Sequence, residues 1–357
     1  MPLQPRRLGN LWPVSALTLG GGGIGGIWGP TDRREAVATV RAAVDAGITL
    51  LDTAPSYGDG EAENVIGEAF DGRLPEGVRV TSKCLLGNRP VDEVSERLHR
   101  SVRESLTRLR VDHLDLFFLH SNLVPDDYRY PDDDGSPLGR AGRTLTDRLG
   151  TPWDLWIQAV RPTLEEMVRD GLIGAWGLTG VGLPRTLFGA LRHEHPPAAI
   201  QITSNLLDSP GSMRRYAEPA RPRDLIRAAQ EAGVGVLGIR AVQAGALCRE
   251  IDRDLPADHP ERLDHQRAAP FRALADELSV DPADLAHRYA LAMPGVDSVI
   301  LGVKNRTELA AAVAAAEMRP ARGLDHRADR RSGPARLSFP PGSLPMGAAD
   351  GRGREPC

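Results

Sequence analysis

The chain has 357 residues, 41% of them hydrophobic and 26% charged, and its formal net charge is −4 at pH 7. This balance is typical of a globular protein with a sizeable core, and it argues against a nucleic-acid binder. No apolar run approaches the ~20 residues that span a bilayer, and Met1–Arg7 is not followed by the hydrophobic segment of a secretory signal. Cys84, Cys248 and Cys357 have neither disulfide nor metal-ligand spacing. We therefore expect a cytoplasmic protein without a metal site that binds neither nucleic acid nor membrane.

Short apolar runs alternate with longer segments of helical period along most of the chain. The runs, which we predict as strands, are Leu17–Gly20, Ile48–Asp52, Val78–Lys83, Leu114–His120, Ile173–Leu178, Ala199–Thr203, Val234–Ile239 and Ser298–Leu301. The predicted helices are Arg34–Ala46, Glu61–Phe70, Val91–Leu109, Pro162–Arg169, Pro184–Arg192, Pro222–Ala232, Gln266–Leu278, Ala283–Ala292 and Thr307–Glu317.

This alternation predicts a (β/α)8 TIM barrel, because parallel strands need helical crossovers and closure leaves no sheet edge. The alternative is an open doubly wound sheet, which would carry a nucleotide-binding glycine fingerprint after its first strand. Gly20–Gly26 is rich in glycine, but no long amphipathic helix starts directly behind it. We interpret it as a strand-end loop with close backbone approach, and only secondarily as a phosphate cradle.

Two segments lie outside the alternation. Residues 121–161 form a long connection after the fourth strand, which is typical of a lid, a binding loop or disorder. Residues 319–357 are rich in Arg, Gly and Pro and poor in large apolar side chains, so we expect a disordered tail. The predicted organisation is one barrel over residues 1–320 and a tail over residues 321–357.

Four chemically different side chains follow three consecutive predicted strands. Asp52 ends one strand, Tyr57 lies in the loop behind it, Lys83 ends the next strand, and His120 ends the third. The active site of such a barrel lies at the C-terminal ends of its strands. Lys83 is conspicuous for a second reason, because Lys83 and Lys304 are the only lysines among 44 basic residues. We therefore predict a catalytic site at these strand ends.

A proton-transfer role fits these residue types. A phenol with a pKa near ~10 donates a proton poorly at neutral pH until a cation stabilises its phenolate. Tyr57 is thus the predicted general acid, with Lys83 lowering its pKa and Asp52 orienting Lys83. His120 is expected to donate to a carbonyl oxygen or to relay the proton. None of them supplies hydride, so carbonyl reduction at this site implies a nicotinamide cofactor.

Several motifs carry a resemblance to a known family. Asp52–Gly58 reads DTAPSYG, Glu63–Gly67 reads ENVIG, and Ser101–Leu109 reads SVRESLTRL, with His120 shortly behind. From Val14 to Ala316 the chain resembles the aldo-keto reductase family. The resemblance implies a barrel that binds NADP(H) in extended form and interconverts aldehydes or ketones and alcohols through the four residues above. It also implies an N-terminal hairpin, before Val14, that closes the bottom of the barrel.

The resemblance assigns cofactor-binding positions around the rim of the barrel. The candidates are Gly21, Gly22, Asp52, Thr179, Gln201, Ile239, Arg240, Gly302, Val303, Lys304, Asn305, Arg306 and Glu308. Two positions depart from the family pattern. Gly180 stands where members usually have an Asn that contacts the nicotinamide amide, and Ile239 lies where an aromatic ring usually stacks on the nicotinamide.

The segment from Gly302 to Glu308 resembles the family's loop for the adenosine 2′-phosphate. Lys304 and Arg306 at a predicted helix start are suitable partners for a phosphate. Glu308 would repel a phosphate and could accept from a ribose hydroxyl, which favours NAD(H). On balance we expect NADP(H) to be favoured over NAD(H).

The loops above the barrel are expected to select a small carbonyl or alcohol substrate. Candidate substrate contacts are Trp28, Tyr57, His120 and Trp153. If Arg240 points inward, it favours a polar or anionic substrate; the alternative is a salt bridge at the rim. The sequence gives neither the natural substrate, nor the direction of the reaction, nor the oligomeric state.

Two other functions stay open at this stage. A nucleotide-sensing regulatory subunit with little turnover would suit the departures at Gly180 and Ile239, but it has no use for an intact set of proton-transfer residues. An aldolase would use Lys83 as a Schiff-base nucleophile. The oxidoreductase is the interpretation that we prefer.

Overall fold

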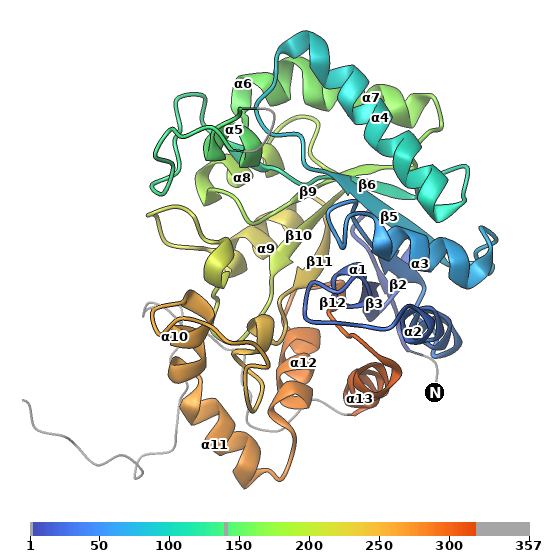
Figure 1. Ribbon diagram of the computed structural model, residues 1–357, viewed down its shortest axis with the longest axis vertical. Coiled ribbons are helices and arrows are strands. Elements are labelled where there is room, and N and C mark those ends of the chain that lie inside the picture. The colour runs from blue at the N-terminus through green and yellow to red at the C-terminus, as the bar shows by residue number, and fades with distance from the viewer. Residues whose placement is uncertain (1–2, 139–141, 319–357) are drawn as a thin grey trace, which may run out of the picture. The chain divides into compact units, whose positions relative to one another are not determined.

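The structure is a computed structural model that describes residues 3–138 and 142–318 (Figure 1). Its centre is a closed barrel of parallel strands in the order β10-β11-β12-β3-β4-β5-β6-β9. These strands are β3 (Leu17–Gly20), β4 (Leu50–Asp52), β5 (Arg79–Cys84), β6 (Leu116–Leu119), β9 (Trp176–Thr179), β10 (Ala199–Thr203), β11 (Gly235–Ile239) and β12 (Ser298–Leu301). The predicted (β/α)8 barrel is confirmed. The predicted tail, residues 321–357, lies outside the described residues.

Each predicted apolar run overlaps one barrel strand, but some strands begin later than predicted, and β5 and β9 end one residue later. Leu114 and Ile173, both predicted as strand starts, form only an isolated parallel bridge with each other. Continuous pairing between β6 and β9 starts at Phe117 and Trp176. The apolar run therefore extends beyond the strand, because residues leading into the barrel are buried before they are paired.

Helices cover the outside of the barrel (Figure 1). They are α2 (Arg33–Asp45), α3 (Glu61–Phe70), α4 (Val91–Leu109), α7 (Arg161–Arg169), α8 (Pro184–Leu191), α9 (Pro222–Glu231), α12 (Pro282–Ala292) and α13 (Arg306–Glu317). The apolar stripe of α4 is buried, with Val94, Leu98 and Val102 fully covered. Gly47 and Gly171 follow α2 and α7 with φ of 90° and 72°, the left-handed conformation that ends helices.

The segment between β11 and α12 holds two helices where the sequence predicts one. α10 spans Pro260–Arg267 and α11 spans Ala269–Glu277. Pro270, at the start of α11, lacks the amide N–H that a continuous helix requires, so the helix breaks there. None of the described helices is long and apolar enough to cross a membrane.

The expected N-terminal hairpin is present. β1 (Pro5–Arg7) and β2 (Pro13–Ser15) pair antiparallel. Leu8, in the turn between them, packs in one core cluster with residues of the barrel strands, among them Ala199 and Leu237. A Cβ at Gly235, the first residue of β11, would stand 2.7 Å from the Leu8 side chain. The hairpin therefore closes the barrel at the end where the strands begin.

The glycine-rich stretch forms a single helical turn, α1 (Gly21–Ile24), where the sequence predicts a loop. The predicted close approach of backbone is confirmed. A Cβ at Gly20 would stand 2.3 Å from the carbonyl oxygen of Leu301, and one at Gly23 only 2.0 Å from that of Val303. The glycines are required because the end of β12 lies directly against them.

The long segment after β6 is ordered in its described part, which excludes disorder there. It contains β7 (Asn122–Val124), α5 (Leu145–Leu149), β8 (Gly150–Pro152), α6 (Trp153–Leu155) and a π-helical turn (Trp156–Val160) that leads into α7. β7 and β8 pair with each other outside the barrel. Val124, Tyr130, Leu183 and Tyr216 form a small hydrophobic cluster of their own beside them. This segment is thus a small folded unit beside the barrel, with its own strand pair and hydrophobic cluster.

Candidate active site

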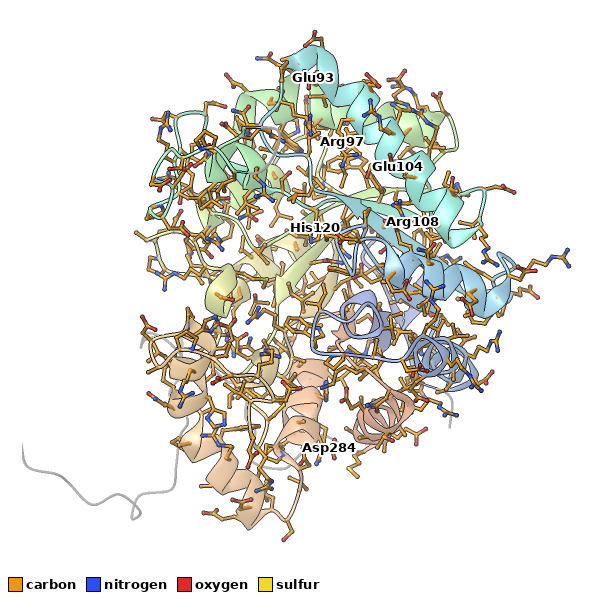
Figure 2. The ribbon with its side chains drawn as sticks, viewed as in Figure 1. Glu93, Arg97, Glu104, Arg108, His120 and Asp284 are labelled. Carbon is orange, nitrogen blue, oxygen red and sulfur yellow. The ribbon has the colours of Figure 1, made fainter. Side chains whose placement is uncertain are left out.

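The four predicted catalytic residues come from three adjacent strands of the barrel. β4, β5 and β6 are neighbours in the sheet. Asp52 ends β4, Lys83 lies at the end of β5, and His120 directly follows β6, close to these strands in Figure 2. Tyr57 lies in the loop between β4 and α3. The barrel therefore brings the four residues to one rim, as the sequence predicts.

Lys83 is fully buried and held by two acceptors. Its ammonium Nζ donates to Oδ2 of Asp52 at 2.7 Å and to the backbone carbonyl of Thr53 at 2.8 Å. The same nitrogen lies 5.0 Å from the centre of the Tyr57 ring. Burial acts to lower the pKa of Lys83, but the charge of Asp52 and the neighbouring Tyr57 outweigh it, so the pKa is raised. Lys83 is therefore a fixed cation beneath the tyrosine.

Asp52 is fixed by further donors on its other oxygen. Oδ1 accepts from the hydroxyl of Thr81 at 2.8 Å and from the amide Nε2 of Gln201 at 2.7 Å. The sequence assigns Gln201 to the cofactor, whereas in the structure its amide N–H holds the aspartate. Sequence analysis overlooks Thr81, although its place two residues before Lys83 puts both side chains on the same face of β5.

Tyr57 and His120 face each other edge to face, with ring centres 5.9 Å apart and planes at 87°. Burial raises the pKa of Tyr57, and the opposing charge of Lys83 offsets only part of this rise. This corrects the expectation of a lowered pKa: the phenol stays protonated through the neutral range. Burial, together with the charge of Lys83, lowers the pKa of His120 to about 3. His120 is therefore a neutral imidazole that can donate one N–H.

Thr179 and Gly180 support the backbone of the site. The Thr179 hydroxyl donates to the carbonyl oxygens of Leu119 and His120, at 3.2 Å each. The Thr179 hydroxyl thus holds the backbone at the end of β6. The sequence predicts that Thr179 contacts the nicotinamide. The Gly180 amide donates to the Gln201 carbonyl at 2.7 Å. A Cβ at this position would stand 2.8 Å from the same oxygen, so the glycine allows close approach.

A buried carboxylate that the sequence analysis did not single out lies behind β5. Glu63 of α3 is fully buried. It accepts from the hydroxyl of Ser82 at 2.6 Å and from Nε of Arg108 at 2.5 Å. Arg108 comes from α4, next to α3 (Figure 2). Because Ser82 precedes Lys83, this set fixes the strand that carries Lys83.

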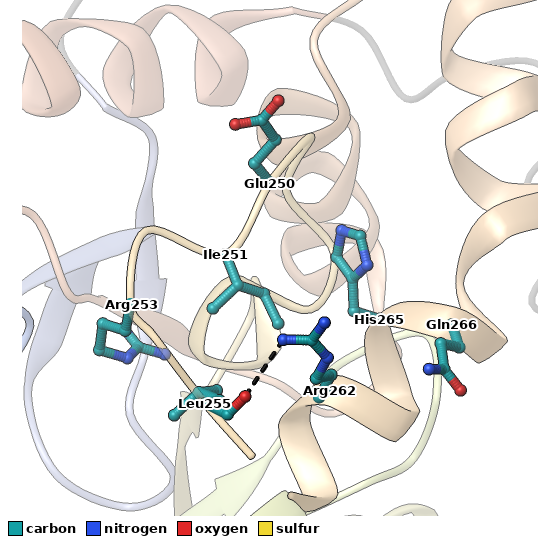
Figure 3. A pocket seen from close by; sticks show the side chains of 7 residues that line it. All are labelled: Glu250, Ile251, Arg253, Leu255, Arg262, His265 and Gln266. Carbon is teal, nitrogen blue, oxygen red and sulfur yellow. Dashed lines mark hydrogen bonds between the residues drawn. The ribbon is translucent and has the colours of Figure 1, made fainter. Parts of the chain in front are cut away.

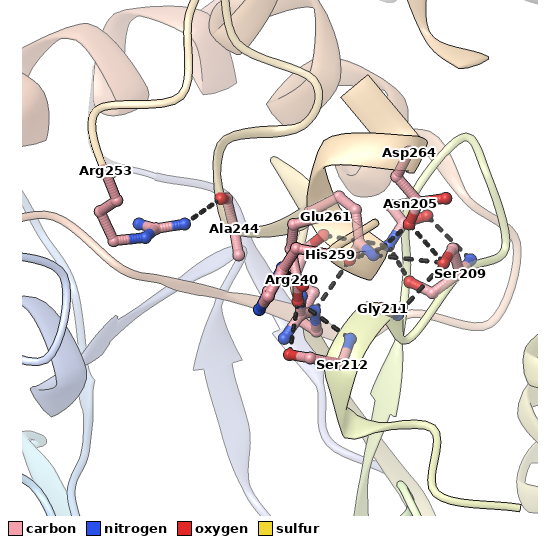
Figure 4. Close-up of polar contacts among 11 residues, drawn as sticks. Asn205, Ser209, Gly211, Ser212, Arg240, Ala244, Arg253, His259, Glu261 and Asp264 are labelled. Carbon is pink, nitrogen blue, oxygen red and sulfur yellow. Dashed lines mark hydrogen bonds and ion pairs between the residues drawn. The ribbon is translucent and has the colours of Figure 1, made fainter. Parts of the chain in front are cut away.

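Arg240, predicted to bind the cofactor, belongs to a buried polar network instead (Figure 4). Its guanidinium pairs with Glu261 of α10, and its Nε donates to Oε1 of Gln243 at 2.8 Å. The Arg240 side chain is 8% exposed and that of Glu261 is 3% exposed. A Cβ at Gly211 would meet the Glu261 carboxylate at 2.6 Å, so this glycine is needed beside the pair. Arg240 thus forms the salt bridge that the sequence leaves open as an alternative.

The predicted phosphate loop lies between β12 and α13. Asn305 caps α13, its Oδ1 accepting from the Glu308 amide at 2.9 Å. Lys304 donates to Asp252 at 2.6 Å. Arg306 forms an ion pair with Glu35 of α2, at 2.9 Å between Nη2 and Oε2. Both predicted phosphate ligands therefore already have carboxylate partners.

The two tryptophans predicted to contact substrate have different places. The indole nitrogen of Trp28 lies 3.0 Å from where a Cβ would stand at both Gly22 and Gly302, so Trp28 bridges the loops after β3 and β12. Trp153 packs against Gly189 of α8, and its ring lies 5.0 Å from that of Trp156. These contacts of Trp153 belong to the helical layer, and its contact with substrate stays a prediction.

Three further cofactor candidates lie along the same rim. A Cβ at Gly21 would stand 2.8 Å from the Thr53 hydroxyl, so the first turn of α1 touches the loop that carries Tyr57. Val303 is buried, and its carbonyl covers Gly23. Ile239 ends β11 and is half-buried.

Figure 3 shows a hollow in the surface that includes Arg253, whose guanidinium lies 5.4 Å from the centre of the Trp28 ring. It is lined by Glu250, Ile251, Arg253, Leu255, Arg262, His265 and Gln266. Arg262 closes one side by donating to the carbonyl of Leu255 at 3.1 Å. The lining of the hollow includes none of the four residues at the strand ends.

The rim residues fit one end of a nicotinamide dinucleotide. A protonated phenol, a fixed ammonium and a neutral imidazole converge on one point, which is the donor set that a carbonyl accepting hydride requires. The glycines after β3 are buried beside them, against Thr53, Trp28 and the Val303 carbonyl. The 2′-phosphate end fits less well, because the two predicted phosphate ligands are paired with carboxylates.

A family profile, curated relatives and solved structures all relate this chain to aldo-keto reductases and other oxidoreductases. The family profile described as "Aldo/keto reductase family" matches residues 16–321. L-galactose dehydrogenase of Arabidopsis thaliana is 25% identical, with 90% of this chain and 91% of the relative covered. A protein of Escherichia coli named NADH-specific methylglyoxal reductase is 33% identical over 31% of this chain and 40% of its own. An aldo-keto reductase structure from Klebsiella pneumoniae in complex with NADPH has a TM-score of 0.60 at 23% identity, covering 89% of this chain and 91% of its own.

Proposed function

Because the chain belongs to the aldo/keto reductase family and is therefore a nicotinamide-dependent oxidoreductase, we propose that the four residues at its strand ends are its catalytic residues. It interconverts a small carbonyl compound and the corresponding alcohol. The observation that carries the assignment is the buried Lys83–Asp52 pair at 2.7 Å directly beside Tyr57. We also propose that the catalytic barrel spans residues 1–320, with residues 321–357 as an appended tail, and that the protein is cytoplasmic.

Tyr57 is the general acid in this proposal. A nicotinamide held at this rim would supply the hydride for the carbonyl carbon. The Tyr57 hydroxyl gives its proton to the carbonyl oxygen, which completes the alcohol and leaves a phenolate. Lys83 stabilises that phenolate, because its ammonium lies beside the ring and is kept charged by Asp52. In the oxidation direction the phenolate takes the proton back from the alcohol.

His120 orients the carbonyl. Its neutral imidazole can donate an N–H to the carbonyl oxygen, and it keeps this form at any pH well above 3, since its pKa is lowered to about 3. Thr179 holds the backbone carbonyl of His120 and thereby fixes the position of the ring.

The two alternative functions gain no support. The family match over most of the chain is to oxidoreductases, and it offers nothing for a regulatory subunit. A Schiff-base lysine needs a lowered pKa so that its amine is free to attack, whereas Lys83 has a raised pKa and its ammonium donates to two acceptors.

The choice of dinucleotide depends on the loop after β12. Lys304 and Arg306 led us to expect NADP(H), and the named relatives point both ways, since one structure holds NADPH and one relative is NADH-specific. The carboxylates that pair with both cations argue against NADP(H).

Replacing Tyr57 by Phe tests the assignment. The variant should lose about 10²- to 10⁴-fold in turnover, because only the proton donor is removed, while binding of NADH or NADPH measured by protein fluorescence is retained. Tyr128→Phe is the matched control, since Tyr128 donates to the backbone of Arg215 at 3.0 Å in the helical layer. Unchanged turnover in Tyr57→Phe would remove the catalytic assignment.

A further inference from the structure

The loop between β12 and α13 carries two cations, and each is neutralised from a different part of the chain. The inference drawn from this rests on the proposed function, because it concerns how the same site selects its dinucleotide. Lys304 donates from Nζ to Asp252 at 2.6 Å and lies 3.6 Å from Glu308. Its backbone amide also donates to Oε2 of Glu308, at 2.9 Å. The carboxylate of Glu308 therefore faces the loop itself.

Arg306 is held by Glu35 of α2 through both its side chain and its backbone. Nη2 donates to Oε2 at 2.9 Å and Nε donates to Oε1 at 3.1 Å, which is a bidentate pair. Oε1 also accepts from the Arg306 backbone amide at 2.9 Å. Because Arg306 is the first residue of α13, Glu35 places its carboxylate at the N-terminus of that helix.

This carboxylate uses the donors that a phosphate would need. A phosphate at a helix N-terminus is bound by the first backbone amides and by a guanidinium or ammonium beside them. Here the Arg306 amide and guanidinium go to Glu35, and the Glu308 amide goes to the cap Asn305. Glu35 thus occupies the position of the anion with a group of the protein itself.

The charges around the loop also balance. Arg253 lies 3.2 Å from Asp252, so three cations (Lys304, Arg306, Arg253) face three carboxylates (Asp252, Glu308, Glu35). The cluster is formally neutral. A phosphate group brings a charge of about −1.5 to −2 at pH 7, and it would meet Glu35 and Glu308 at the same donors. A ribose hydroxyl brings no charge and can donate to a carboxylate.

We propose that Glu35 and Glu308 make this enzyme select NAD(H) over NADP(H), with Glu35 acting as a built-in substitute for the 2′-phosphate. This reverses the expectation drawn from Lys304 and Arg306. The two cations stabilise the protein's own carboxylates, so their presence in the sequence does not indicate a phosphate site.

Direct titration tests the proposal without relying on turnover. Wild type, Glu35→Gln and Glu308→Gln are titrated with NADH and, separately, NADPH, with quenching of tryptophan fluorescence as the readout. Wild type should bind NADH more tightly. In both variants the ratio of the NADPH Kd to the NADH Kd should fall about tenfold. Each substitution removes a carboxylate charge that competes with the 2′-phosphate for hydrogen-bond donors, and the amide has the same size as the carboxylate.

Glu96→Gln is the matched control. Glu96 forms an exposed ion pair with Arg100 on α4, so it loses one carboxylate outside the cluster and should leave the Kd ratio at the wild-type value. A wild type that prefers NADPH, or a Glu35→Gln ratio equal to that of wild type and Glu96→Gln, would overturn the selection by Glu35 and leave the proposed function intact. Binding of neither dinucleotide would instead remove the proposed function.

Discussion

The two lysines of the chain hold carboxylates at almost the same distance, 2.7 Å between Lys83 and Asp52 and 2.6 Å between Lys304 and Asp252. Their surroundings differ: the Lys83 side chain is 0% exposed, whereas Lys304 is 24% and Asp252 50% exposed. Water screens the second pair but not the first. Hydrogen-bond geometry alone therefore does not tell how much an ion pair contributes; burial decides it.

The largest effect is expected from Lys83→Met. Removing the ammonium leaves Asp52 charged and buried, which should lower the free energy of unfolding by about 3–5 kcal/mol, and turnover should fall at least about 10²-fold. Urea unfolding and initial rates measure the two losses. The double variant Lys83→Met/Asp52→Asn should regain stability but not turnover. A loss of stability below 1 kcal/mol in the single variant would contradict the difference between the two pairs.

Arg240→Met extends the comparison to a second buried pair. The remaining Glu261 still accepts from the backbone and hydroxyl of Ser212, at 3.0 and 2.7 Å. The loss in unfolding free energy should therefore be smaller than for Lys83→Met, about 2–3 kcal/mol, with turnover of the folded enzyme within a few-fold of wild type. If turnover instead fell as far as in Lys83→Met, Arg240 would contact cofactor or substrate, as the sequence predicts.

His287 on α12 tests what burial does without a strong partner. Burial lowers its pKa to about 4, against smaller opposing effects of the Ala283 backbone and Asp281. Between the ordinary value near ~6.5 and about 4, the unfolded chain binds a proton that the folded chain does not, so stability falls as pH falls through this window. At pH 5 this amounts to about 2 kcal/mol. Urea unfolding at pH 7 and pH 5 measures the loss of unfolding free energy between the two pH values. The loss should be larger in wild type than in His287→Gln by the contribution of His287. Equal losses in the two proteins would exclude His287 as a source of the pH dependence.

The smallest effect is expected from Lys304→Met. An exposed ion pair contributes about 0–1 kcal/mol to stability. The free energy of unfolding should therefore fall by no more than about 1 kcal/mol. In 1 M NaCl, where the screening length is about 3 Å, the difference from wild type should vanish. The stability difference between Lys83→Met and wild type should persist in the same salt. A loss above 2 kcal/mol for Lys304→Met would erase the contrast between the two lysines.

The sequence predicts the barrel and the placement of the four candidate residues on one rim, because both follow from local information. Asp52, Lys83 and His120 each stand at the end of an apolar run, and parallel strands in a closed barrel end on the same side. The partners of these residues could be predicted only in part. Thr81 follows from the strand period, whereas Glu63 gives no such signal, since a carboxylate on a helix is more often exposed than buried.

The ion-pair partners of the loop after β12 could not be predicted from the residues of the loop itself. Arg306 is held by Glu35, which lies 271 positions earlier in the chain, and Lys304 by Asp252, which lies 52 positions earlier. Only the closed barrel brings these segments together. The direction of the Arg240 side chain was also not predictable from the strand pattern. Arg240 has a φ of 60°, in the left-handed region, and its side chain pairs with Glu261 of α10.

Gly180 has a consequence for how this enzyme can change over evolutionary time. A side chain there would press on the Gln201 carbonyl, and Gln201 in turn holds Asp52. A change from this glycine to asparagine would therefore disturb the aspartate before it gained a contact with the cofactor. Descendants of this protein should therefore keep the glycine, or lose it only after a change in β10. The order in which these two substitutions can occur is thus constrained.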